Sequence, residues 1–198
     1  MLKIGITGGI GSGKTVVAKV FETLGIPVYY SDDAAKRLMN EDETLKEEIR
    51  SQFGEESYID GKLNRSYIAS IAFSNPDKLA LLNSIVHPVT IADAHQWMLQ
   101  QTTPYAIKEA ALTFESGSDK ELDKIIGVYA PAPLRILRAM QRDHSDREAV
   151  LARMKRQMNE EEKMRLCDYV ITNDEQSMIL PQILELHQKF LATPPNLP

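Results

Sequence analysis

The sequence predicts an α/β protein with a five-stranded parallel sheet that is flanked by helices. Two observations support this fold class. Short apolar runs with strand character alternate with longer amphipathic segments along most of the chain. The length of 198 residues, with 43% hydrophobic and 26% charged residues, also suits one compact domain that carries a helical insertion.

The first thirty residues show how the sheet begins. Leu2–Thr7 is an apolar strand that runs into glycines, and residues 14–24 carry apolar side chains at helical spacing. Gly25 suits the end of that helix, and Val28–Tyr30 is a second short strand. A strand, a loop, a helix and a further strand in this order are typical of a parallel sheet.

The middle of the chain is mostly helical between residues 33 and 100. Asp60 and Gly61 mark a turn within it. Pro76 suits the start of a helix, and Pro88 is expected to kink or break the helix that follows. We therefore expect a helical insertion at residues 33–103.

The rest of the chain returns to alternating strands and helices. The expected strands are residues 105–108, Lys124–Tyr129 and Tyr169–Thr172, and the expected helices are residues 134–140, 147–165 and 177–191. Residues 1–32 and 104–198 then form the core, and residues of about 138–160 within it form a lid.

Residues 8–15 carry the chemistry. They read Gly-Gly-Ile-Gly-Ser-Gly-Lys-Thr and satisfy G-x-x-x-x-G-K-[ST], the P-loop pattern, between the first strand and the first helix. Glycines let backbone amides approach phosphate closely, and the helix N-terminus adds a favourable dipole. Lys14 reaches the terminal phosphates of ATP, and the Thr15 hydroxyl binds Mg²⁺. The expected nucleotide contacts are Gly9, Ile10, Gly11, Ser12, Gly13, Lys14, Thr15 and Val16.

Two carboxylates follow the second strand. Asp32 and Asp33 stand at its carboxyl end, which we expect to lie beside the P-loop, and Mg²⁺ prefers oxygen ligands. One of them could accept a proton from an attacking hydroxyl. The alternative is that they cap a helix from Ala34. For Asp32 we favour the functional role over helix capping, and for Asp33 we leave both possibilities open.

From the P-loop onward, nearly the whole chain resembles the dephospho-coenzyme A kinase family. Residues 7–14 read TGGIGSGK, the form of the P-loop in that family, and residues 25–32 resemble its G-x-P-V-I-D-A-D, with Tyr30 in place of the first aspartate. Residues 82–88 match L-N-x-I-x-H-P, which other P-loop kinases lack. Residues 112–115 resemble P-L-L-F-E, with Ala111 in place of the proline and Thr113 in place of a leucine. Residues 137–143 resemble its lid motif L-x-R-x-x-x-R-D.

The resemblance implies phosphorylation of the ribose 3′-hydroxyl of dephospho-CoA by ATP with Mg²⁺. It places the catalytic base on Asp32 and substrate contacts on Thr7, Asp32 and His87. It also implies that Arg138 and Arg142, which share one helical face, act with Lys14 to stabilise the moving phosphoryl group. Gln157 and Asn173 also match family positions, in the lid helix and near the adenine.

Two other functions stay open at this point. One is another small-molecule P-loop kinase that acts on a nucleoside monophosphate or a metabolite hydroxyl. The other is a non-catalytic nucleotide switch, although the sequence has no N-K-x-D or D-x-x-G segment. The net charge of −5 argues against nucleic acid as a partner. The single Cys167 and the lack of a signal peptide or membrane-length apolar run favour a cytoplasmic protein. The sequence does not fix the oligomeric state, and we expect a monomer or a weak homo-oligomer.

Overall fold

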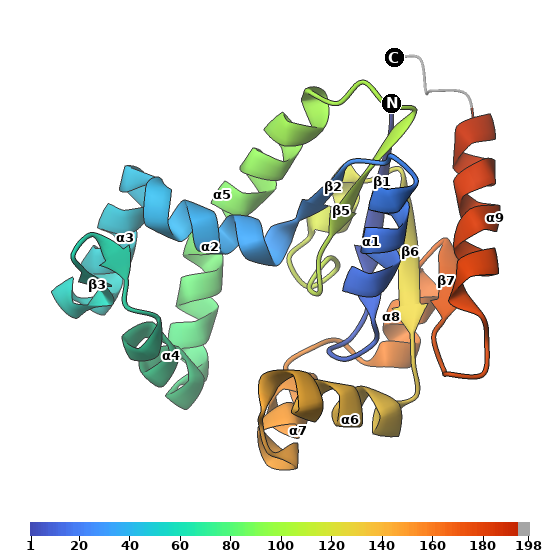
Figure 1. Ribbon diagram of the computed structural model, residues 1–198. Coiled ribbons are helices and arrows are strands. Elements are labelled where there is room, and N and C mark those ends of the chain that lie inside the picture. The colour runs from blue at the N-terminus through green and yellow to red at the C-terminus, as the bar shows by residue number, and fades with distance from the viewer. Residues whose placement is uncertain (194–198) are drawn as a thin grey trace. The chain divides into compact units, whose positions relative to one another are not determined.

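The computed structural model describes residues 1–193, apart from the side chain of Phe73 (Figure 1). The chain divides into two compact units. The sheet unit comprises Met1–Tyr30 and Met98–Pro198, and the helical unit comprises Ser31–Trp97. The first division falls before Asp32, so Asp32 lies in the helical unit and not in the core to which the sequence pattern assigned it. No helix among residues 1–193 combines the length and the hydropathy that crossing a membrane requires.

Five parallel strands make up the sheet of the sheet unit. They are β1 (Leu2–Thr7), β2 (Val28–Tyr30), β5 (Tyr105–Glu109), β6 (Lys124–Tyr129) and β7 (Tyr169–Thr172). Their order across the sheet is β2-β5-β1-β6-β7, and every neighbouring pair is parallel. The predicted fold class is confirmed. The order also puts β5, and not β2, next to the strand that carries the P-loop.

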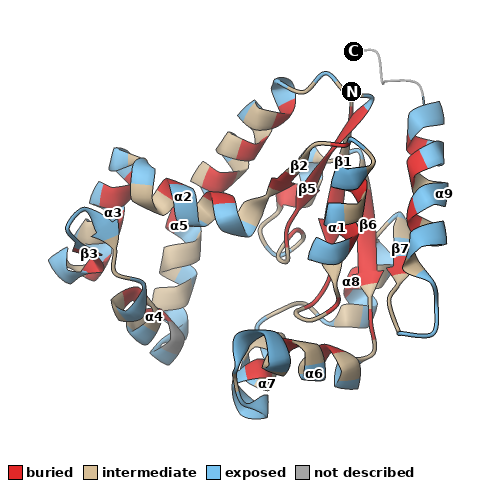
Figure 2. Ribbon diagram, in the orientation of Figure 1, coloured by how far each residue is buried: buried red, intermediate tan, exposed pale blue. Residues whose placement is uncertain are grey.

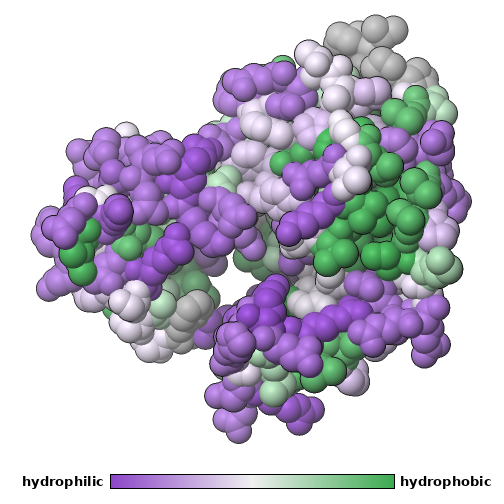
Figure 3. All heavy atoms as spheres, in the orientation of Figure 1, coloured by the Kyte–Doolittle hydropathy of each residue, from purple (hydrophilic) through white to green (hydrophobic). Residues whose placement is uncertain are grey.

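Helices cover both faces of this sheet. α1 (Lys14–Thr23) and α9 (Ile179–Ala192) pack together on one face, and α8 (Glu160–Leu166) contacts β6. The side chains of Ile4, Ile6, Tyr105, Phe21 and Phe190 form the dry centre of the first face. Figure 2 shows the burial of the central strands, and Figure 3 shows further apolar side chains gathered on the surface over α1 and α9.

The helical unit has a core of its own. Its elements are α2 (Ser31–Glu41), α3 (Glu43–Phe53), the 3₁₀ turn η1 (Glu55–Ser57), β3 (Tyr58–Ile59), β4 (Lys62–Leu63), α4 (Arg65–Ser74) and α5 (Pro76–Leu99), of which α5 runs into the sheet unit. Leu45, Ile49 and Phe53 from one face of α3 are buried there with Ile85 and Val86 of α5. A hydrophobic cluster separate from that of the sheet is the reason this segment forms a unit.

Three local details differ from the sequence-based expectations. The predicted turn at Asp60 and Gly61 closes a short β3–β4 hairpin that the helical pattern concealed. α2 begins at Ser31, so Asp32 and Asp33 lie within its first turn and do not cap a helix from Ala34. Pro88 does not break its helix, because α5 continues past it as one helix of 24 residues.

The lid region forms a helical hairpin, α6 (Ala132–Asp143) and α7 (Arg147–Lys155). The predicted helix over residues 147–165 is wrong as one element, because Asn159 caps a separate α8 through its side chain. Asp143 joins the two helices of the hairpin. Its carboxylate accepts from Arg142 Nε at 2.7 Å and from Arg153 Nη1 at 2.7 Å. The hydrogen bonds from Arg142, joined by those from Arg153, lower the pKa of Asp143 to about 2 against the opposing effect of burial.

This shift predicts a pH-dependent contribution to stability. Because the folded-state pKa of Asp143 is depressed, its contribution is present above the ordinary aspartate pKa of about 4 and is lost as the pH falls toward about 2. Asp143→Asn should therefore lower the free energy of unfolding at about pH 7, and the gap to wild type should narrow as the pH falls below about 4. Urea unfolding at several pH values measures the gap. A gap of equal size at every pH would contradict a charge-based origin.

Candidate phosphoryl-transfer site

The P-loop joins the carboxyl end of β1 to the first turn of α1. Gly11 and Gly13 have φ values of 77° and 93°, and Gly13 is the N-cap of α1 in the left-handed conformation. The Ser12 amide donates to the carbonyl of Gly9 at 3.1 Å and so closes a tight turn. Within the described chain, the amides of Gly11, Gly13, Lys14 and Thr15 donate to no protein group. These four unused donors at a helix N-terminus form an anion-binding site.

Close packing also explains the glycines at positions 9 and 13. A side chain at Gly9 would collide with the Arg135 guanidinium and the Glu160 carboxylate. A side chain at Gly13 would collide with the Asn173 amide, which donates to the Ser12 carbonyl at 2.9 Å. The loop is therefore fixed from outside by residues that follow β6 and β7 in the chain.

Lys14 pairs with a buried carboxylate that sequence reasoning missed. Its Nζ lies 3.7 Å from Glu109 Oε1, and the two side chains are 11% and 6% exposed. Glu109 is the last residue of β5, the strand beside β1, and it lies opposite Ile6 in the register of the sheet. Asp32 and Asp33 follow β2, which we expected to lie next to the P-loop strand β1. That expectation was wrong, because β5 lies between β2 and β1. An acidic residue directly after a predicted buried strand was the signal for Glu109.

Thr15, Val16 and Thr7 lie at the edges of this site. Thr15 and Val16 occupy the first turn of α1 and are exposed. Thr7, which ends β1, is fully buried, and its hydroxyl donates to the Ala111 carbonyl at 3.5 Å. Among residues 1–193, no group of three or more His, Cys, Asp or Glu side chains could hold a metal ion by itself. The Thr15 hydroxyl and the Glu109 carboxylate nevertheless suit Mg²⁺, which binds oxygen and retains waters or substrate phosphates.

The arginines of α6 reach different partners. Arg138 Nη1 donates to the Asn173 carbonyl at 3.1 Å, and Arg138 Nη2 lies 3.1 Å from Glu175 Oε1. Because Asn173 also binds the P-loop, the structure brings together Arg138 and Asn173, two positions that the sequence singled out. Arg142 lies one turn further along α6 and binds Asp143 in the lid hairpin.

A buried ion pair lies against the start of the loop, and sequence reasoning missed it as well. Arg135 Nη1 and Glu160 Oε2 are 2.9 Å apart, and the side chains are 7% and 11% exposed. Glu160 Oε1 also accepts from the Gly9 amide at 3.4 Å. Arg135 shares a face of α6 with Arg138 and Arg142, at spacings of three and seven residues. The spacing of the three arginines in the sequence could therefore have indicated that Arg135 belongs to the site.

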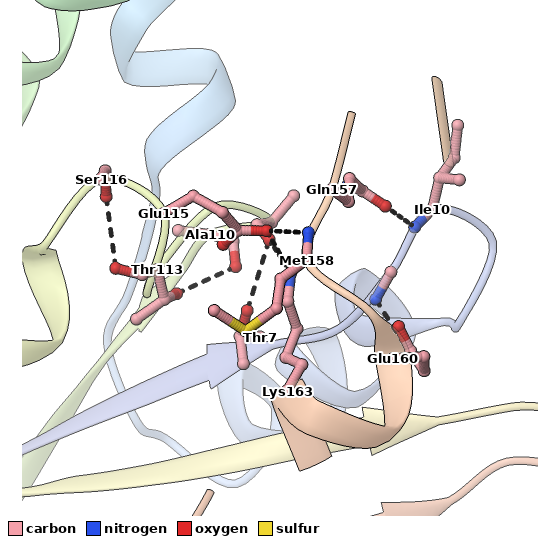
Figure 4. A network of polar contacts seen from close by, with 12 residues as sticks. Thr7, Ile10, Ala110, Thr113, Glu115, Ser116, Gln157, Met158, Glu160 and Lys163 are labelled. Atoms are coloured by element: carbon pink, nitrogen blue, oxygen red, sulfur yellow. Dashed lines mark hydrogen bonds and ion pairs between the residues drawn. The ribbon is translucent and has the colours of Figure 1, made fainter. Parts of the chain in front are cut away.

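The hydrogen bonds of Glu115 give the motif at residues 112–115 a structural role (Figure 4). Its carboxylate accepts from the Met158 amide at 2.8 Å and from Lys163 Nζ at 2.9 Å, and the Lys163 side chain has no exposed surface. Burial alone would raise the pKa of Glu115, but these two donors outweigh it and lower that pKa. Lys163 also donates to the Ala111 carbonyl at 2.8 Å, so α8 is fixed to the loop after β5.

The remaining predicted residues belong to the helical unit. Asp32 and Asp33 are exposed in the first turn of α2, where negative charge is favoured by the helix dipole, and Asp33 Oδ1 accepts from Lys36 at 2.7 Å. His87 is half-buried in α5, directly before Pro88. Tyr30, at the position of a family aspartate, donates from its hydroxyl to Glu22 at 2.8 Å and so has a structural partner within the sheet unit.

Comparison with known proteins identifies the family of this chain. Residues 2–178 match the sequence profile of the dephospho-CoA kinase family, CoaE. A dephospho-CoA kinase of Bacteroides fragilis is 40% identical over 186 residues, covering 93% of this chain and 91% of its own. One of Porphyromonas gingivalis is 36% identical over 199 residues, covering 100% of this chain and 98% of its own.

Solved structures agree on the fold. The crystal structure of TT1252 from Thermus thermophilus superposes with a TM-score of 0.81 at 34% identity, covering 96% of each chain. Dephospho-CoA kinase from Campylobacter jejuni superposes with a TM-score of 0.68 at 27% identity, covering 94% of this chain and 96% of its own. Shikimate kinase from Bacteroides thetaiotaomicron, at 14% identity and a TM-score of 0.55, shares the P-loop kinase fold alone. With the P-loop, Lys14 and the profile match spanning most of its length, this chain belongs to the dephospho-CoA kinase family.

Proposed function

We propose that this kinase transfers the terminal phosphoryl group of Mg²⁺-bound ATP to the ribose 3′-hydroxyl of dephospho-CoA, which gives CoA and ADP. One observation carries the proposal: four unused amide donors and Lys14 stand at one edge of the sheet beside the Glu109 carboxylate, in a chain of this family. Such a site binds phosphate, and the family supplies the acceptor.

Lys14 and the arginines act on the phosphoryl group. Before ATP binds, Glu109 neutralises the buried Lys14 ammonium. When phosphates occupy the amides of the loop, Lys14 turns from Glu109 to the terminal phosphates and stabilises the charge that shifts during transfer. Arg138, already fixed beside the loop by Asn173, adds a permanent cation, and Arg142 does so when the lid, residues 138–160, closes and excludes water.

Mg²⁺ fits the oxygen donors next to Lys14. The Thr15 hydroxyl and the Glu109 carboxylate would hold it, either directly or through water, together with phosphate oxygens. Bound there, Mg²⁺ would neutralise charge on the phosphates during transfer. Glu109 then has a cationic partner both before and after Lys14 moves.

Asp32 is the proposed general base. It follows β2 by two residues, and in this family the base occupies the position of Asp32. The proton of the 3′-hydroxyl moves to its carboxylate while the oxygen bonds to phosphorus and ADP leaves. His87 and Thr7 contribute to the binding of dephospho-CoA. We further infer a cytoplasmic enzyme, a monomer or weak homo-oligomer, with no nucleic-acid or membrane partner.

Asp32→Asn tests the base. We expect the variant to bind ATP normally and to lose a factor of about 10² or more in kcat, because the hydroxyl keeps its proton. Acceptor-dependent release of ADP measures the loss. Asp33→Asn, the same change at the adjacent exposed residue, is the matched control and should retain most activity. Near-normal turnover of Asp32→Asn would remove Asp32 from the mechanism.

His87→Ala tests the acceptor site. The KM for dephospho-CoA should rise by about tenfold with little change in the KM for ATP, because about one hydrogen bond to the acceptor is lost. His95→Ala changes the other histidine of α5 and should leave both constants unaltered. An unchanged KM for dephospho-CoA in His87→Ala would exclude the histidine from the site.

Glu109→Gln tests the metal site. We expect the Mg²⁺ concentration for half-maximal activity to rise by about tenfold, because a carboxylate ligand becomes a neutral amide. Calorimetric titration with ADP provides a readout that does not depend on turnover. The variant should bind ADP without Mg²⁺ at least as well as wild type does, and gain less affinity when Mg²⁺ is added. An equal gain in both proteins would contradict this role.

A further inference from the structure

Two amides of the P-loop donate hydrogen bonds to side chains at the C-terminal end of the lid. The Ile10 amide donates to Gln157 Oε1 at 2.9 Å, and the Gly9 amide donates to Glu160 Oε1 at 3.4 Å (Figure 4). The sequence predicted that Gly9 and Ile10 contact the nucleotide. In the structure their amides already have acceptors, whereas those of Gly11, Gly13, Lys14 and Thr15 have none among the described residues. The loop thus divides its donors between phosphate and protein.

The acceptors come from one short segment, residues 157–163, which we call the bracing segment. The bracing segment also contacts the loop that follows β5. The Met158 amide and Lys163 Nζ both donate to Glu115, and Lys163 also donates to the Ala111 carbonyl. Glu109, the partner of Lys14, is the last residue of β5 and directly precedes that loop. The bracing segment therefore connects the phosphate-binding loop with the loop that presents the acidic partner of Lys14.

Polar contacts fix the position of this segment more than packing does. Gln157 to Glu161 line one wall of a cavity of about 490 Å³, whose other walls include Leu151 and Met154 of α7 and Ala130. A backbone beside such a space has few apolar neighbours to hold it. The hydrogen bonds to Ile10 and Gly9, with the Arg135–Glu160 pair, are then what sets the segment against the P-loop.

We propose that Gln157 and Glu160 are positioning residues that set the P-loop in its phosphate-binding shape before nucleotide arrives and tie the end of the lid to that shape. The proposal rests on the proposed function insofar as the nucleotide is ATP. The side chains touch backbone amides and not the reacting atoms. Removing an acceptor leaves a partly buried amide without its protein partner and lets the first turn of the loop rearrange, so phosphate meets a less ordered set of donors.

Gln157→Met tests the proposal, since it keeps the length of the side chain and removes the acceptor. We expect the affinity for Mg²⁺-ADP, measured by calorimetry, to fall by about tenfold, the effect of losing one hydrogen bond that orders the loop. The KM for dephospho-CoA should stay within about twofold. Hydrogen exchange of the Ile10 amide, followed by NMR without nucleotide, should accelerate, and Gln157→Glu should restore its protection because a carboxylate oxygen accepts the same bond.

The same change at the exposed Gln188 of α9 is the matched control and should leave nucleotide affinity and loop exchange unchanged. Wild-type affinity for Mg²⁺-ADP in Gln157→Met, or unaltered exchange at Ile10, would overturn the proposal. If Gln157→Met does not fold, Glu160→Ala serves in its place, with the Gly9 amide as the reporter and Glu161→Ala as its control. Because ADP binding needs no acceptor, failure to phosphorylate dephospho-CoA would count against the proposed function and leave this test intact.

Discussion

The structure depends most on the close approach between the P-loop and the residues that surround it. Arg135 of α6, Glu160 of α8 and Asn173, directly after β7, lie where side chains of the loop would otherwise be. Only glycine leaves room for them at positions 9 and 13, and the positive φ values at Gly11 and Gly13 also favour glycine there. Phosphate binding is therefore a property of the packed sheet unit and not of the eight-residue motif alone.

Strand order decides which charges meet at this site. Because β5 lies between β2 and β1, the residue beside Lys14 is Glu109, and the ammonium is neutralised in the absence of nucleotide. A buried lysine without such a partner would resist its charged form. Asp32 lies at the start of the helical unit, so the proposed nucleotide site and the proposed general base belong to different parts of the chain. Each of the two units has a hydrophobic core of its own.

Much of this could be predicted from the sequence, and the reasons for the failures are physical. The P-loop and the five strands have strong local signals, namely glycines before a Lys-Thr pair and apolar runs of strand length. The β3–β4 hairpin has two residues in each strand, too few for an alternating pattern. Glu109, Arg135 and Glu160 were missed because their roles arise from strand order and from contacts over 25 to 151 residues of sequence. Glu115 and Gln157 were noticed by resemblance, and the structure supplies the hydrogen bonds that give them a physical role.

The most direct test of the central claim is a phosphoryl-transfer assay with ATP, Mg²⁺ and a panel of acceptors, in which the mass and the phosphate position of the product are determined. The panel should contain dephospho-CoA, nucleoside monophosphates and shikimate. The account predicts ADP release that depends on dephospho-CoA, with a product one phosphate heavier that carries the new group on the ribose 3′-oxygen. Faster transfer to another acceptor, a phosphate at a different position, or ADP release that does not require dephospho-CoA would contradict it.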